Sequence, residues 1–215
     1  MSLLLSSAVA SSAIPGSVVD NFEDYSDGPY RSSESLSDYY SGDLGYFSRS
    51  SIDAGPVYDG SYSLECDHPG SGKSITADGT LPNYPSKGDT VEWRIHKSQD
   101  LDYISFGFGQ DTNNRYYIDL FESSRGGLEL YVYENGSQVG SDTDNSHNNT
   151  TGEWMRMELT IQDPVTVVLE DSSGNQEASA SVSFSGDVTG NFFKIHGNGN
   201  SNSAGVVYYD EFIII

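Results

Sequence analysis

The sequence predicts an all-β protein, folded as a two-layer antiparallel β-sandwich. Three observations support this fold class. Apolar and polar residues alternate strictly in many short segments, and Gly, Asn, Asp and Pro turn signals separate these segments about every eight to twelve residues. No segment keeps a helical period. About a dozen short strands of this kind are typical of a sandwich.

Alternation is clearest in the middle of the chain. Val91, Trp93 and Ile95 would face the core, and the residues between them would face outward. The Asn135-Gly136 dipeptide predicts a type I′ hairpin turn after one of these strands. Further strands are predicted at 17–23, 45–48, 62–66, 104–109, 115–121, 127–134, 153–161, 165–170, 178–184 and 190–196.

The C-terminal run 205–215 (GVVYYDEFIII) is the most β-prone segment of the chain. An apolar edge strand of this kind needs a partner, so we expect it to pair with the run 17–24 (SVVDNFED). Alternation places Asp210 on the same side as Tyr208 and Phe212. Both faces of the strand would then be apolar, and the outward face would need a cover from the N-terminal segment or a neighbouring subunit.

The charge balance narrows the range of partners. Asp and Glu number 32 against 10 Lys and Arg, and the net charge is -22. Such a field repels nucleic acid and anionic membranes, so we expect neither as a partner. A surface this acidic is typical of halophilic proteins, whose self-repulsion is screened in strong salt. An acidic surface protein of a mesophile is the alternative.

Residues 17–215 are expected to form a single β-sandwich domain, because no composition break, linker or repeat divides them. Residues 1–16 resemble a signal peptide but lack a basic region, and we interpret them as an N-terminal arm docked on a neighbour. Cys66 is the one cysteine, so no internal disulfide can form. No apolar run is long enough to span a membrane.

Four stretches carry a resemblance to a known superfamily. They are 19–24 (VDNFED), 59–64 (DGSYSL), 151–159 (TGEWMRMEL) and 207–212 (VYYDEF). Their order resembles that of concanavalin A-like (laminin-G-like) jelly rolls, the lectin and glucanase sandwich. The resemblance implies a jelly-roll fold, but not a function, because this superfamily contains lectins, hydrolases and structural modules.

A hydrolase of the glucanase type is the least favoured of the functions that the resemblance implies. Retaining glucanases of the superfamily carry a Glu-x-Asp-x-x-Glu strand, whose carboxylates flank the scissile bond. The nearest string here is 117–122 (YIDLFE), where Tyr117 stands at the nucleophile position. Asp119 and Glu122 would also face opposite sides of a regular strand. The sequence therefore predicts a protein that is not an enzyme, with no catalytic residues.

A glycan-binding surface is predicted from the polar positions of the central strands. Aromatic platforms combined with charged groups are what sugar sites need, and one sheet face could hold both. The alternative is a solvated sheet face with cross-strand ion pairs. The candidate residues are Arg94, His96, Tyr117, Asp119, Tyr131, Tyr133, Arg156 and Glu158.

A structural calcium ion is a further expectation, implied by the resemblance. Related jelly rolls hold Ca²⁺ between an N-terminal acid and an acid of the last strand, and Ca²⁺ prefers such hard oxygen ligands. The matching positions are Asp20, Glu23 and Asp210, with the turn at Gly60 as a carbonyl donor. The alternative is that acids fall everywhere in so acidic a chain. The four histidines have no zinc-like spacing.

Three glycosylation sequons, at Asn135, Asn148 and Asn149, lie in predicted loops. The leading functional hypothesis is a non-enzymatic structural or adhesion protein on the virion surface of a halophilic archaeal virus. Its expected partners are other virion proteins, further copies of itself and cell-surface glycans. The alternative is a secreted or cell-surface carbohydrate-binding module, and the third possibility is a glycoside hydrolase.

Overall fold

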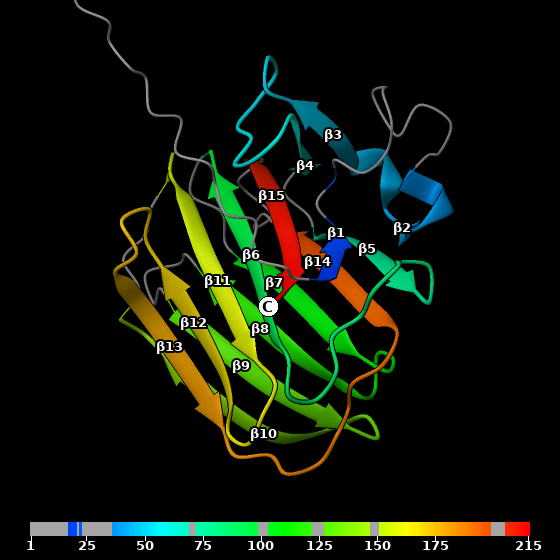
Figure 1. Ribbon diagram of the computed structural model, residues 1–215, viewed down its shortest axis with the longest axis vertical. Coiled ribbons are helices and arrows are strands. Elements are labelled where there is room, and N and C mark those ends of the chain that lie inside the picture. The colour runs from blue at the N-terminus through cyan, green and yellow to red at the C-terminus, as the bar shows by residue number, and fades with distance from the viewer. Residues whose placement is uncertain are drawn as a thin grey trace, which may run out of the picture.

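The computed structural model describes residues 17–20, 22, 36–68, 72–98, 103–121, 127–146, 151–198 and 205–215. They form two antiparallel sheets packed face to face, which confirms the predicted β-sandwich (Figure 1). Within these residues, no helix is long and apolar enough to cross a membrane.

The first sheet, called sheet A here, has the order β13-β12-β11-β6-β15-β4-β3, with β1 also paired to β15. The second, sheet B, has the order β10-β9-β8-β7-β14-β5-β2. Sheet A contains β1 (Ser17–Asp20), β3 (Phe47–Ser51), β4 (Tyr62–His68), β6 (Thr90–Lys97), β11 (Trp154–Thr160), β12 (Val165–Glu170), β13 (Gln176–Val182) and β15 (Gly205–Ile214). Sheet B contains β2 (Ser41–Gly42), β5 (Lys73–Asp78), β7 (Tyr103–Gly109), β8 (Arg115–Phe121), β9 (Gly127–Glu134), β10 (Ser137–Asp144) and β14 (Phe192–Asn198).

Alternating apolar residues of the two sheets meet in one core. Trp93 of β6 lies 4.9 Å from Phe106 of β7 and 5.9 Å from Phe212 of β15, measured between ring centroids. Phe193 of β14 approaches Phe212 to 4.9 Å. All four side chains are fully buried, so the aromatic residues join the sheets at the centre of the sandwich.

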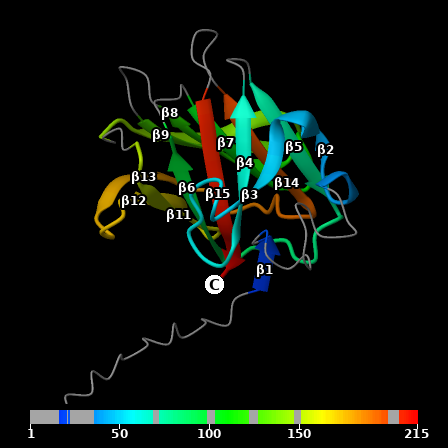
Figure 2. The same ribbon diagram turned by 90° about the horizontal axis from the view of Figure 1, so that it is seen from above.

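The two ends of the described chain pair, as predicted. Strand β1 lies beside the end of β15 (Figure 2). Val18 of β1 is the register partner of Ile213 of β15. Strand β1 thereby covers the C-terminal half of β15, and β4 covers its N-terminal half through pairs such as Tyr209 with Leu64. The apolar C-terminal strand is therefore protected from pairing with other chains.

A β-bulge overturns the predicted alternation at the end of β15. Glu211 has a φ of 51°, and the register with β6 shifts between Asp210 and Ile213. An extra residue of this kind re-aims the side chains that follow it. Tyr208 and Asp210 consequently face outward, whereas Phe212 points into the core instead of lying beside them.

The chain's own loop 52–61 covers the outward face of β15, where an N-terminal arm or a second subunit was expected. Gly55 lies so close to the Tyr208 ring that a Cβ on Gly55 would be 2.6 Å from it. The backbone N–H groups of Tyr58 and Asp59 donate to Asp210 Oδ2 at 3.0 and 3.4 Å. The expected arm, residues 1–16, lies outside the described residues.

Carboxylates close the gap between the edge strands β10 and β13, which lie side by side (Figure 1). Asp142 and Asp144 of β10 accept hydrogen bonds from the backbone N–H groups of Ser181 and Ser179 at 2.7 and 2.9 Å. These are edge N–H groups of β13, so the carboxylates block strand addition at this edge.

Some elements were not predicted from the sequence. Strand β5 and the two-residue β2 complete sheet B next to β14, and short 3-10 helices occupy Leu36–Asp38 and Leu44–Tyr46. Strand β10, which extends from Ser137 to Asp144, was not among the predicted strand ranges. The Asn135-Gly136 hairpin prediction is confirmed, since both residues have positive φ and join β9 to β10.

Candidate functional site

The eight predicted glycan-binding residues do not share one sheet face, so the prediction of a single surface is wrong, while their binding of glycans stays a prediction. Arg94, His96, Arg156 and Glu158 lie on β6 and β11 of sheet A. Tyr117, Asp119, Tyr131 and Tyr133 lie on β8 and β9 of sheet B. The chain passes from one sheet to the other between β6 and β7 and again between β10 and β11. Outward residues of the two groups therefore face opposite sides of the sandwich.

The sheet A group forms an ion network centred on Arg156. Its guanidinium contacts Glu92 at 2.5 Å and Glu170 at 2.9 Å, and it also contacts Glu158. Arg94 contacts Glu92 at 2.6 Å. Burial raises the pKa of Glu92, but hydrogen bonds and charges of the two arginines outweigh this effect and lower it. Such a network matches the alternative of a sheet face with cross-strand ion pairs.

Aromatic side chains surround the rest of that face. Arg94 lies 4.6 Å from the centroid of the Tyr58 ring, which packs edge-on against Trp154 at 5.8 Å. His96 lies between Trp154 and Tyr208, at 5.3 and 5.9 Å. Burial lowers the pKa of His96. The rings pack against one another and against the loop 52–61. These contacts therefore hold that loop on the outer face of sheet A.

The sheet B group forms a compact aromatic platform. Ring centroids of Tyr117, Tyr131 and Tyr133 lie 6.2 to 6.5 Å apart. Arg115 lies over two of these rings, 5.0 Å from the centroid of Tyr117 and 4.8 Å from that of Tyr133. Register explains the cluster, because Tyr117 is paired with Tyr131 and Arg115 with Tyr133 across the β8–β9 ladder.

Two carboxylates adjoin the platform. Asp119 is the register partner of Glu129, which accepts a hydrogen bond from the Tyr131 hydroxyl. Burial and the nearby charge of Glu129 raise the pKa of Asp119 to about 6, while Ser105 and Arg115 act in the opposite direction. We call the six residues Arg115, Tyr117, Asp119, Glu129, Tyr131 and Tyr133 the tyrosine face.

Hydrogen-bonding capacity is left over on this face. Asp119 Oδ1, Ser105 Oγ and Arg115 Nε are buried and have no hydrogen-bond partner among the described residues. Buried polar atoms without partners are rare in folded proteins and commonly mark a place where a water molecule or a ligand binds. The tyrosine face therefore combines aromatic surface with polar atoms available to a ligand.

Two members of the tyrosine face, Arg115 and Glu129, were missed from the sequence. Alternation could have found them, because Arg115 precedes Tyr117 by two residues and Glu129 precedes Tyr131 by two. Glu122, the proposed companion of Asp119 in a glucanase-like string, lies outside the described residues. Among the described residues, the direct carboxylate neighbour of Asp119 is Glu129.

The predicted calcium ligands are held by protein donors where the structure describes them. Asp20 accepts hydrogen bonds from Phe22 N at 3.0 Å and from the Tyr40 hydroxyl at 2.8 Å. Asp210 accepts from N–H groups of the turn that was expected to supply a carbonyl oxygen. Glu23 lies outside the described residues. No group of three or more His, Cys, Asp or Glu side chains within the described ranges could hold a metal ion.

One sequon lies in the described part of the chain. Asn135 is exposed at the tip of the β9–β10 hairpin, and its backbone N–H donates to Asn114 Oδ1 at 2.9 Å. Asn148 and Asn149 lie outside the described residues.

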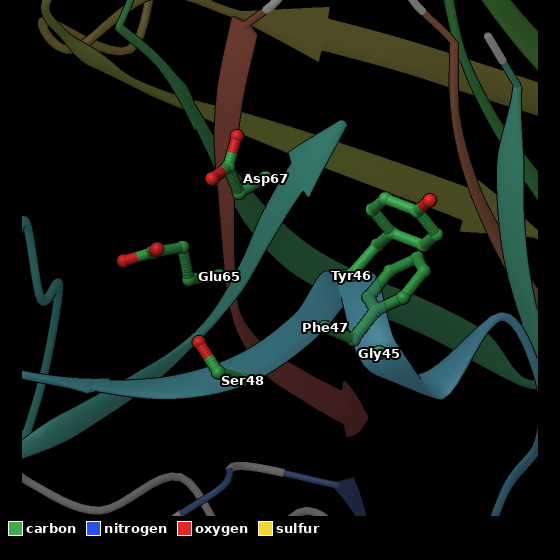
Figure 3. A pocket seen from close by; sticks show the side chains of 6 residues that line it. All are labelled: Gly45, Tyr46, Phe47, Ser48, Glu65 and Asp67. Atoms are coloured by element: carbon green, nitrogen blue, oxygen red, sulfur yellow. The ribbon is translucent and has the colours of Figure 1, made fainter. Parts of the chain in front are cut away.

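A hollow of about 340 Å³ lies elsewhere, beside β4 of sheet A (Figure 3). Glu65 and Asp67 of β4 line it together with residues 45–48. Lys73 lies 4.3 Å from the ring centroid of Tyr46, another lining residue, and 3.9 Å from Asp43. Acidic side chains on their own do not define a ligand, and the hollow shares no residue with the tyrosine face.

The sequence matches no protein-family model, and the comparison with curated proteins finds no match. Similar solved structures include galectin-Va of Xenopus laevis, with 17% identity over 57% of this chain and 89% of the galectin, at a TM-score of 0.41. A complex of toad ovary galectin with N-acetylgalactose has 14% identity over 61% and 96% of the two chains, at 0.42. An HCR/D point mutant has 14% identity over 80% of this chain and 44% of its own, at 0.50. At such identities the likeness concerns the fold alone, a two-layer antiparallel β-sandwich.

Proposed function

We propose that the protein is a non-enzymatic glycan-binding module and that the tyrosine face of sheet B is its binding surface. One observation carries the proposal. Three tyrosine rings lie together beside Arg115, whose Nε is unpartnered, and beside Asp119, whose Oδ1 is unpartnered among the described residues. In the sheet A group Arg94 Nη1 and His96 Nδ1 are also buried without a hydrogen-bond partner among the described residues. There, however, both arginines contact Glu92, and the aromatic rings pack against one another.

The chemistry of the face suits a sugar. A pyranose ring presents C–H groups on its faces, which pack on aromatic rings, and hydroxyl groups at its edge, which need polar partners. Hydrogen bonds between hydroxyls and a charged carboxylate or guanidinium are stronger than neutral ones. Asp119 and Glu129 would accept from hydroxyls while the tyrosine rings support the sugar.

The test is glycan-array binding followed by calorimetric titration of any hit. We expect Tyr131→Ala to lower the affinity at least tenfold, because it removes one ring of the platform. Tyr58→Ala is the matched control, since Tyr58 is an accessible tyrosine of the loop over sheet A. If Tyr58→Ala or Arg94→Ala abolishes binding and Tyr131→Ala does not, the binding site lies on sheet A and this assignment is wrong.

We further propose that the module serves adhesion or surface structure on the virion of a halophilic archaeal virus. The net charge of -22 supports a high-salt environment. Mass spectrometry of purified virus particles tests this wider role, and absence of the protein from the particles would refute it. In that case a secreted or cell-surface carbohydrate-binding module becomes the favoured role, with the same tyrosine face.

A glycoside hydrolase is the second candidate, favoured by one observation. Asp119 and Glu129 are cross-strand neighbours, and the raised pKa of Asp119 is the property that a general acid needs. The test is release of reducing ends from polysaccharides that bind. Turnover that Asp119→Asn abolishes while binding persists would establish the hydrolase, and absence of turnover with every bound glycan would leave the binding module.

A further inference from the structure

We propose that the glycan bound at the tyrosine face carries an anionic group, which lies between Arg115 and Lys194 in a gap over Gly107. This inference rests on the proposed glycan-binding function and adds the chemical class of the ligand. The shared chemistry is a carboxylate or a sulfate on a sugar.

The gap arises because the central strand of this region has no side chain at position 107. Gly107 of β7 is paired with Lys194 of β14 on one side and with Tyr117 of β8 on the other. A Cβ built on Gly107 would lie 3.4 Å from Phe192 Cε1, 3.5 Å from Lys194 Cβ and 3.6 Å from Arg115 Cδ. Lys194 therefore starts beside Gly107, and the Arg115 side chain, which starts beside Gly109, reaches the same position with its Cδ, next to the tyrosine platform.

Both cations lack an ion-pair partner among the described residues. Arg94 and Arg156 of sheet A, by contrast, are both paired with carboxylates. The carboxylate of Asp43 lies close enough to influence Lys194, but it contacts Lys73 and accepts from Ser74 N. Asp119, which also acts on Lys194, is the register partner of Ser105 and lies two pairs further along the strands.

The environment of Lys194 indicates which ligand charge would be favourable. Burial and the positive charge of Arg115 both lower the pKa of Lys194. An anion placed between the two side chains would remove this repulsion and would give the buried Arg115 Nε a hydrogen-bond acceptor. A neutral hydroxyl at the same place would leave the repulsion between the cations in force.

The experiment uses three versions of one oligosaccharide: neutral, with a carboxylate and with a sulfate. Calorimetry on the full-length protein measures the affinity of each. We expect at least one anionic version to bind about tenfold more tightly than the neutral one. Comparison of the carboxylate and sulfate versions shows which of the two anionic groups is preferred. Lys194→Gln should lower the anionic-to-neutral ratio about tenfold, and Lys87→Gln, at an exposed loop lysine, should leave that ratio unchanged.

A second variant fills the gap without changing any charge. Gly107→Val should weaken binding of the anionic version most, because its side chain would occupy the space between Lys194 and Arg115. Gly45→Ala is the control, as a Cβ there would meet nothing within 4 Å. Circular dichroism confirms that each variant is folded before binding is compared.

The outcomes separate this inference from the proposed function. Equal binding of all three versions, with each lost in Tyr131→Ala, would overturn the anionic preference and leave the glycan-binding function in place. A preference for the anion that Lys194→Gln does not reduce would also overturn it. If none of a broad panel of glycans binds, both proposals are wrong.

Discussion

Asp119 of β8 and Glu129 of β9 are direct register partners, so two carboxylates stand side by side on the outer face of sheet B. Their positions in the sequence are ten residues apart, in strands joined by a segment outside the described residues. Direct cross-strand neighbours of like charge disfavour one another. Here the repulsion adds to burial, since only 9% of Asp119 is exposed.

The first prediction concerns the pH dependence of stability through Asp119. Its pKa is about 6 in the folded protein against an ordinary value of 3.8, so folding favours the protonated form. The stabilising contribution is complete below pH 3.8 and is lost as the pH rises through 6. Asp119→Asn removes this ionisation. The free energy of unfolding of the variant, relative to that of the natural protein, should therefore rise by about 2 kcal/mol from pH 4 to pH 7.

Urea unfolding at both pH values measures this difference. Asp78→Asn, at an exposed position of β5, is the matched control for loss of one negative charge from an acidic protein. A stability difference between Asp119→Asn and the natural protein that is the same at pH 4 and pH 7 would contradict the prediction.

The second prediction concerns the hub of the sheet A network. Arg156→Ala would leave Glu92, Glu158 and Glu170 close together without their shared cation. We expect a loss of about 1 to 3 kcal/mol in the free energy of unfolding, because Glu92 is buried, Glu158 and Glu170 are partly exposed, and the three carboxylates would repel one another. Their partial exposure keeps the loss below that of a fully buried ion pair.

Salt distinguishes charge repulsion from lost packing in this variant. The loss should shrink between 0.1 M and 2 M NaCl, since the screening length falls from about 10 Å to less than 3 Å. Arg156→Met keeps much of the aliphatic packing without the charge, and it should show the same salt dependence. A loss that is equal at both salt concentrations would show that packing dominates.

The third prediction concerns the hairpin turn between β9 and β10. Gly136 has a φ of 75°, a region in which a Cβ is strained. Gly136→Ala should therefore cost about 1 to 2 kcal/mol of stability. Gly45→Ala is the control, because that position has no positive φ and is open. Thermal unfolding of both variants tests the comparison, and equal melting temperatures would contradict it.

The fourth prediction concerns the expected calcium ion. If Asp20, Glu23 and Asp210 hold Ca²⁺, EDTA will lower the melting temperature of calcium-saturated protein, since an ion that binds the folded state alone stabilises it. Asp20→Asn should then abolish the response to EDTA. An unchanged melt would show that the N–H and hydroxyl donors of Asp20 and Asp210 are sufficient without an ion.

Much of the fold was predictable because its causes are local. Alternation identified the buried side of the central strands, and Val91, Trp93 and Ile95 are fully buried as predicted. The Asn135-Gly136 turn was predictable because positive φ at two successive positions favours these residue types. Strand β5 was missed since its residues, 73–78 (KSITAD), carry only a weak apolar pattern.

What the sequence determined by itself was therefore the class of fold, the core residues and the pairing of the two ends, since an apolar C-terminal strand requires a partner. Tertiary structure alone decided which strands share a sheet. Alternation shows on which face of its strand a side chain lies, but it does not show which sheet contains that strand. Tertiary structure separated Arg94 and Arg156 from Tyr117 and Tyr131, which the sequence could not do. It also decided the bulge at Glu211, where long-range packing of Phe212 against Trp93 prevailed over regular alternation.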